Sequence, residues 1–274
     1  MRAMISADME GATGVTYPHD VEPRAAEWDR FRKLFTADAN AVALGLLDAG
    51  IDDIVINEAH ATMRNILLED LDERVRLLTG RHKPLGMMQG IQETDAVVFL
   101  GYHSGAGEKG VLSHTYLGNA ILGVWLDGVP ASEGYLNGKL AKEYGVPVIM
   151  VTGDNKACED AVRYAPNAEH VAVKEYVSRY AAICFPPART FQMQREAAGR
   201  AASLAGQVEP MVAPHRIEIE FDAVQLADAT AIIPTVEYTG ERRVAFEAPT
   251  MTDAMKTFKV VSSIAALSRE DFYD

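Results

Sequence analysis

The chain has 274 residues, with 26 Lys plus Arg against 39 Asp plus Glu, and a formal net charge of −13 at pH 7. This acidic balance argues against nucleic acid as a partner, because binding to the phosphate backbone requires clustered positive charge. The length is sufficient to bury a substantial core without disulfides. The two cysteines, Cys158 and Cys184, are too few for a disulfide framework and are not spaced like a zinc knuckle.

The first residues run directly into a strand-like segment and lack the apolar stretch of roughly 7 to 15 residues that marks a secretory signal. No window approaches the run of about 18 apolar residues that a membrane helix needs. We therefore expect a cytoplasmic protein that has no membrane partner.

Short apolar runs alternate with helical patterns through the first half of the chain. This alternation predicts βαβ units and a largely parallel sheet flanked by helices. A helix is expected over 28–46, where large apolar residues recur every three or four positions. Strands are expected at 1–7, 51–57, 94–100, 147–151 and 170–174. The fold class is therefore α/β.

The rest of the chain has a different pattern. A turn signal at Asp127-Gly128 predicts a hairpin over 124–129, followed by a helix that begins near Ser132. Farther along, the expected elements are a long helix after the Pro186-Pro187 pair, a strand at 216–221 with alternating polar and apolar residues, a strand around 243–246, and a final helix from about residue 251. We expect a catalytic α/β domain at 1–190 and a smaller α+β portion at 191–274 packed on it.

Acidic and histidine side chains follow the ends of three predicted strands. Asp8 and Glu10 are two residues apart at the end of the first strand, so both carboxylates point to the same side. His60 follows the second strand and His103 the third. Ligands of open α/β sheets bind at the carboxyl ends of the strands. Imidazole with carboxylate favours zinc, and manganese or cobalt also accept this set.

The segment 105–110 matches the pattern G-x-G-x-x-G of dinucleotide-binding loops. The residues that follow it, 111–116, have a strand-like pattern, whereas a dinucleotide loop leads into a helix. We therefore interpret the glycines as a tight loop that leads from His103 towards His114.

Several motifs together resemble the D-aminopeptidases of the dipeptide-operon type, a family of self-compartmentalising zinc peptidases. They are SADMEGATG from Ser6 to Gly14, NEAH ending at His60, FLGYH ending at His103, SHTY containing His114, SEG containing Glu133, and VPVIMVTGD ending at Asp154. The resemblance extends over residues 1 to about 190 and is looser beyond.

The resemblance implies a centre with two zinc ions per subunit. Its ligands would be Asp8, Glu10, His60, His103 and Glu133. Five residues give three protein ligands to each metal if one carboxylate bridges them, and we expect Asp8 to be the bridge. A pair of zinc ions activates water for attack on an amide.

The resemblance also implies a further active-site histidine outside the ligand set, which falls on His114. Its expected role is proton transfer, and a nucleophilic role is an alternative. The implied activity is removal of N-terminal D-amino acids from short peptides or amides. The implied assembly is a ring-shaped homo-oligomer, commonly a decamer.

Two other functions are compatible with the same residues. A di-metal amidohydrolase acting on a non-peptide amide would need the same ligands, because activated water attacks any correctly held amide. A non-catalytic assembly protein stabilised by metal is the alternative of another class, although structural zinc sites favour cysteine-rich ligands. Substrate profiling separates the first from a peptidase, and loss of the fold on chelation without turnover would indicate the second.

Overall fold

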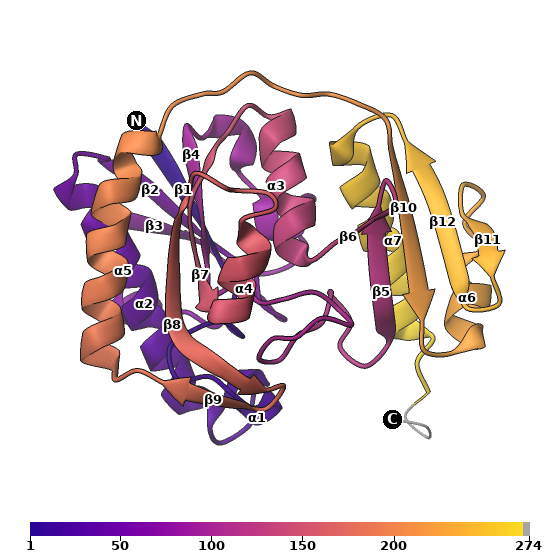
Figure 1. The fold of residues 1–274 in the computed structure, drawn as a ribbon, viewed down its shortest axis with the longest axis horizontal. Helices are drawn as coiled ribbons and strands as arrows, with labels where there is room; N and C mark the ends of the chain where they lie inside the picture. Colours follow the sequence, from indigo (N-terminus) through magenta and orange to yellow (C-terminus); the bar gives the residue numbers. More distant parts are fainter. Residues whose placement is uncertain (271–274) are drawn as a thin grey trace.

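A computed structural model describes residues 1–270 and shows two lobes, each built on one sheet (Figure 1). The larger lobe has a seven-stranded sheet in the order β3-β2-β1-β4-β7-β8-β9. Its strands are β1 (Arg2–Ala7), β2 (Asp53–Glu58), β3 (Val75–Leu78), β4 (Ala96–Leu100), β7 (Val148–Asp154), β8 (Glu169–Ser178) and β9 (Ala181–Cys184). All neighbouring pairs are parallel except β8 with β9. The expected α/β class and mostly parallel sheet are confirmed.

Helices cover both faces of this sheet, which explains why its central strands are apolar without alternation. Every residue of β4 is buried, for example. The helices α2 (Trp28–Asp48) and α5 (Pro187–Ala201) pack against each other on one face, and α3 (Glu133–Glu143) and α4 (Asn155–Ala161) lie on the other. Ser132 caps α3 and Asp154 caps α4 through side-chain oxygens that accept hydrogen bonds from backbone N–H groups.

The smaller lobe has an antiparallel sheet in the order β11-β12-β10-β5-β6. Its strands are β5 (Ile121–Leu126), β6 (Val129–Pro130), β10 (His215–Phe221), β11 (Glu237–Gly240) and β12 (Arg243–Ala248), and its helices are α6 (Val224–Thr230) and α7 (Met251–Leu267). The hairpin predicted at Asp127-Gly128 joins β5 to β6, with positive φ at both residues.

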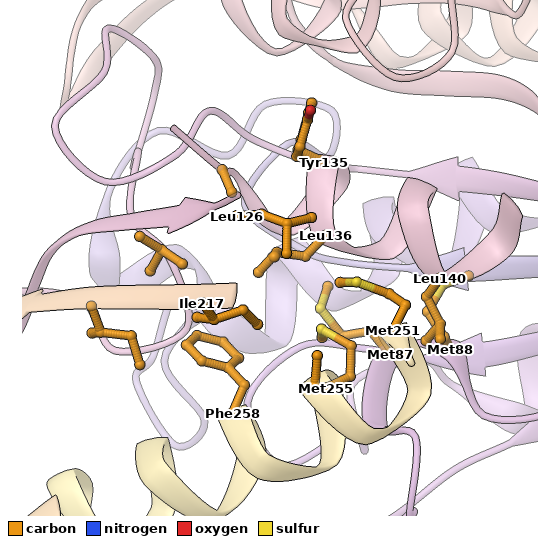
Figure 2. Packing of buried hydrophobic residues seen from close by; sticks show 14 of the residues in the cluster. Met87, Met88, Leu126, Tyr135, Leu136, Leu140, Ile217, Met251, Met255 and Phe258 are labelled. Carbon is orange, nitrogen blue, oxygen red and sulfur yellow. The ribbon is translucent and has the colours of Figure 1, made fainter. Parts of the chain in front are cut away.

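One hydrophobic cluster joins the two lobes (Figure 2). Met255 and Phe258 on α7 belong to it together with Leu136 and Leu140 on α3 and Ile217 on β10. All five side chains are buried, with exposed fractions of 8% or less. The lobes are therefore packed against each other through a continuous apolar interior.

Each lobe takes segments from both sides of residue 190. The hairpin of β5 and β6 lies in the smaller lobe's sheet, and α5, which extends past residue 190, packs on α2 in the larger lobe. The division of the chain into a catalytic α/β domain at 1–190 and a smaller α+β portion at 191–274 stays a prediction.

The strand-like pattern at 111–116 is misleading, because this segment is irregular. Leu112 and Tyr116 have φ values of 53° and 59°, which no regular strand contains. Elements that the sequence pattern did not reveal are short: β3, β9, β11, α6, the helix α1 (Pro18–Val21), and the 3-10 turns Leu68–Asp70, Gly86–Met88, Ile91–Glu93 and Ala202–Leu204. Within residues 1–270, no helix combines the length and apolar character that crossing a bilayer requires.

Candidate metal centre

The predicted ligands meet at the carboxyl edge of the parallel sheet. Strand β1 lies between β2 and β4, so the loop with Asp8 and Glu10 has the loops of His60 and His103 on either side. Glu133 reaches the same place as the first residue of α3. All five side chains are buried, with exposed fractions of 8% or less.

A close approach of two backbones brings these loops together. Gly11 N donates a hydrogen bond of 2.7 Å to Gly101 O. A Cβ atom added to Gly11 would lie 2.2 Å from Tyr102 O, so only glycine fits there. This contact places the Asp8 loop directly beside His103.

Asp8 faces both histidines, each with a different oxygen. His60 Nδ1 lies 3.5 Å from Asp8 Oδ1 and 2.9 Å from Glu10 Oε2. His103 Nε2 lies 3.3 Å from Asp8 Oδ2 and 3.6 Å from Glu133 Oε1. Two groups of potential ligands share Asp8, one with Glu10 and His60 and the other with His103 and Glu133. A third group, Glu10 with His103 and His114, does not contain Asp8. In each group the ligand atoms lie within 4.8 Å of one another.

The polar atoms in this cluster fit a bound cation. The contacts of His60 Nδ1 with Glu10 Oε2 and of His103 Nε2 with Asp8 Oδ2 do not have hydrogen-bond geometry, so among the described residues Asp8 Oδ2, Glu10 Oε2 and His103 Nε2 are buried atoms without a hydrogen-bond partner. Buried charged groups are strongly unfavourable unless they are paired or coordinate a metal. Because two of the three atoms are carboxylate oxygens and the third is an imidazole nitrogen, the donor set suits zinc.

The crowding of charges shifts the proton affinities of the histidines and acids. Burial alone would lower the pKa of His103, but the charges of Glu133 and Asp8 outweigh it and raise that pKa to about 10. The pKa of His60 is likewise raised well above its usual value, because Glu10 and Asp8 outweigh the effect of burial. Burial raises the pKa of Glu133 to about 7. Metal binding needs deprotonated ligands, so it would displace these protons.

His114 lies on the irregular loop and stacks on His103, with ring centroids 4.3 Å apart and planes 9° from parallel. Its Nδ1 is 2.8 Å from Leu112 O, so Nδ1 carries the hydrogen and Nε2 is unprotonated in the neutral ring. Nε2 lies 3.8 Å from both Glu10 Oε1 and Glu133 Oε1. Burial and the neighbouring His103 lower the pKa of His114 to about 4. His114 is thus a neutral base beside the ligand cluster.

The sequence analysis missed Glu58, which shapes the turn that carries His60. The Glu58 carboxylate is fully buried and accepts hydrogen bonds from Asn65 N at 2.9 Å and Ile66 N at 2.5 Å. Asn65 Nδ2 in turn donates to His60 O at 3.0 Å. His60 Nε2 lies 2.9 Å from Val21 O, which leaves Nδ1 directed at the cluster. Only the position of Glu58 inside the NEAH motif could have indicated this role.

The second group of ligands has its own supports. His103 Nδ1 is 3.0 Å from Ser104 O, which directs Nε2 towards Asp8. Glu133 Oε1 accepts a hydrogen bond of 2.7 Å from Tyr116 N. The structure therefore brings all six predicted site residues together and orients the three histidines through backbone carbonyls.

Comparison with known proteins shows the family of this chain. Residues 1–260 match the sequence model of the D-aminopeptidase family. The D-aminopeptidase of Bacillus subtilis (strain 168) is 32% identical over 272 residues, which cover 97% of this chain and 98% of the relative. The solved structure of the Zn-dependent D-aminopeptidase from Bacillus subtilis, described as a self-compartmentalizing protease, aligns with a TM-score of 0.93 at 30% identity over 99% of this chain and 100% of that chain. The chain therefore belongs to the D-aminopeptidase family.

Proposed function

We propose that this protein is a zinc-dependent aminopeptidase that releases N-terminal D-amino acids from short peptides or amides. The observation that carries the proposal is the position of Asp8, whose two oxygens face two separate histidines in a buried cluster with unpartnered ligand atoms. Its family membership and the zinc dependence of the solved relative support the same conclusion.

The site would hold two zinc ions per subunit. Asp8, Glu10 and His60 would bind one, and Asp8, His103 and Glu133 the other. A metal pair held there would polarise the scissile carbonyl and would lower the pKa of a bound water towards about 7. Asp8 is the only residue common to both groups, so we assign it as the bridging ligand.

His114 is the proposed proton carrier. Its Nε2 is unprotonated because Nδ1 donates to Leu112 O, so it accepts a proton from the attacking water and then donates that proton to the leaving amine. Its burial keeps the ring neutral before the reaction begins. The stacking against His103 places Nε2 of His114 next to the ligand cluster. His114 belongs to neither of the two groups of ligands that contain Asp8.

We also propose that the protein self-associates into a ring, with a decamer as the expected size. The solved relative is described as self-compartmentalizing. On this chain, Tyr17, Val177, Tyr180 and Ile183, on or beside α1 and the β8–β9 hairpin, expose between 44% and 58% of their surface. Mass measurement in solution tests the assembly separately from the chemistry. The cytoplasmic location stays a prediction.

The decisive experiment is hydrolysis of paired D- and L-alanyl amides and dipeptides by the purified protein, before chelation, after chelation and after zinc is restored. We expect D-selective release that chelation abolishes and zinc restores. Cleavage of other amides without action on either peptide series would indicate the non-peptide amidohydrolase. Tightly bound zinc without any turnover would indicate a non-catalytic role.

A further inference from the structure

Lys174 is a buried cation that the proposed chemistry does not use. It lies on β8, and its side chain has no exposed surface. Nζ donates hydrogen bonds to three backbone carbonyls, Glu10 O at 2.6 Å, Ala12 O at 3.0 Å and Val15 O at 2.6 Å. An ammonium group has three hydrogens, so each one has an acceptor.

The three acceptors belong to the loop that follows β1. Their carbonyl oxygens converge on one point, an arrangement that is unfavourable in a buried place unless a cation or donor occupies that point. Lys174 Nζ occupies that point. It therefore fixes the curvature of the loop at three places, including the backbone of the candidate ligand Glu10.

An acidic residue holds the same loop at Thr13. Asp38 on α2 is buried and accepts hydrogen bonds from Thr13 N and Thr13 Oγ1, both at 2.8 Å. Gln194 on α5 donates to Asp38 Oδ1 at 2.7 Å, which ties the carboxylate to a second helix. The loop is thus held by two buried charged groups. The ammonium of Lys174 donates to three of its carbonyls, and the carboxylate of Asp38 accepts from the N–H group of Thr13.

We infer that Lys174 and Asp38 are positioning residues that hold the loop 10–15 so that the Glu10 carboxylate is presented to the metal group of Asp8, Glu10 and His60. The metal part of this inference rests on the proposed function, whereas the ordering of the loop does not. The second group has separate supports, because His103 is bonded to Ser104 O and Glu133 to Tyr116 N. The loop contacts therefore act on one metal position more than on the other.

The first test is Lys174→Met, which keeps the length of the side chain and removes the ammonium. Lys156→Met is the matched control, because Lys156 carries the same charge but pairs with Glu159 on the surface of α4. We expect Lys174→Met to weaken one of two zinc equivalents by about 10- to 100-fold in chelator competition, the range typical of residues that orient metal ligands. The other equivalent and both equivalents of Lys156→Met should keep the affinity of the unaltered protein.

Hydrogen exchange of the metal-free proteins tests the loop independently of zinc. Amides of residues 11–15 should exchange faster in Lys174→Met than in the unaltered protein and in Lys156→Met, while the strands β1 and β4 keep their protection. If Lys174→Met is too unstable to purify, Asp38→Asn provides the same measurement. This substitution keeps the size of the side chain, but its amide NH₂ group replaces one of the two carboxylate oxygens that accept hydrogen bonds from Thr13.

The outcomes separate this inference from the proposed function. A folded Lys174→Met or Asp38→Asn variant with two zinc equivalents at unaltered affinity and unaltered exchange at 11–15 would overturn the inference and leave the two-metal site intact. An unaltered protein that binds fewer than two zinc ions would refute the two-metal proposal. In that case, the exchange of the loop amides still decides whether these residues hold the loop.

Discussion

Zinc binding should release protons, and the structure allows their number to be worked out. Without metal, His103 has a pKa of about 10 and the pKa of His60 is raised well above its usual value, so both are protonated at pH 7. Glu133 has a pKa of about 7 and holds a fraction of a proton. All three must be deprotonated to bind zinc, so we expect release of about two protons or slightly more at pH 7.

This proton release sets the pH dependence of the affinity. A proton held with a pKa of about 10 weakens apparent zinc binding at pH 7 by about a thousandfold, because that proton must first be removed. The apparent affinity should therefore rise steeply between pH 6 and 8, by about a hundredfold per pH unit if two protons leave. Titration calorimetry in buffers of different ionisation enthalpy measures the proton count directly.

His114 provides the internal control for this measurement. Its pKa is about 4, so it holds no proton at pH 7, and His114→Gln should leave the proton release unchanged. Binding that releases no protons, with an affinity that does not vary between pH 6 and 8, would refute the assigned protonation of the histidines. If His114→Gln releases fewer protons on zinc binding than the unaltered protein, then His114 itself carries a proton at pH 7, which would contradict its assignment as the neutral ring.

The remaining predictions concern substitutions and the stability of the metal-free protein. His114→Gln should lower kcat by about 10²- to 10⁴-fold with zinc still bound, as a steady-state assay and metal analysis would show; near-normal turnover would exclude His114 as the proton carrier. Asp8→Asn should lose both zinc equivalents in equilibrium dialysis, whereas the exposed Asp52→Asn should keep them. Glu58→Gln should weaken zinc binding by about 10- to 100-fold in chelator competition by loosening the turn of His60, and unaltered affinity would contradict that role. The metal-free protein should lose thermal stability as the pH rises from about 6.5 to 10. Protonated His103 stabilises the fold below pH 6.5, because its pKa is raised to about 10 in the folded protein, and this contribution is lost as the pH passes 10. A melting temperature that increases over this pH range would contradict the prediction.

The sequence allowed the parallel sheet and the convergence of the ligands to be predicted because both depend on local patterns. Apolar runs that end in Asp8, His60 and His103 mark strand ends, and neighbouring parallel strands bring their ends to one edge. Glu133 was different, since only the family resemblance assigned it to the site. Its position depends on the start of α3, which no periodicity relates to the parallel strands.

The supports of the site could not be predicted, because they arise from tertiary contacts between distant segments. Lys174 is 164 residues from Glu10 along the chain, and its position in β8 gives no indication of which carbonyls it meets. The loop around His114 was also predicted incorrectly. Its apolar and β-branched residues resemble a strand, but the positive φ values of Leu112 and Tyr116 are imposed by contacts that a local pattern does not contain.

The smaller lobe contributes to the site through the loop that carries His114. Tyr116 on this loop packs edge-on against Phe258 of α7, with ring centroids 4.9 Å apart, and its N–H group holds Glu133. The larger lobe instead holds Asp8, Glu10 and His60 through its sheet, Lys174 and Glu58. The group of Asp8, Glu10 and His60 therefore depends on contacts within the larger lobe, whereas Glu133 and the proton carrier also depend on how the lobes pack. A substitution that weakens the packing of Tyr116 on Phe258 should consequently lower the rate of turnover more than it lowers the zinc affinity of the group of Asp8, Glu10 and His60.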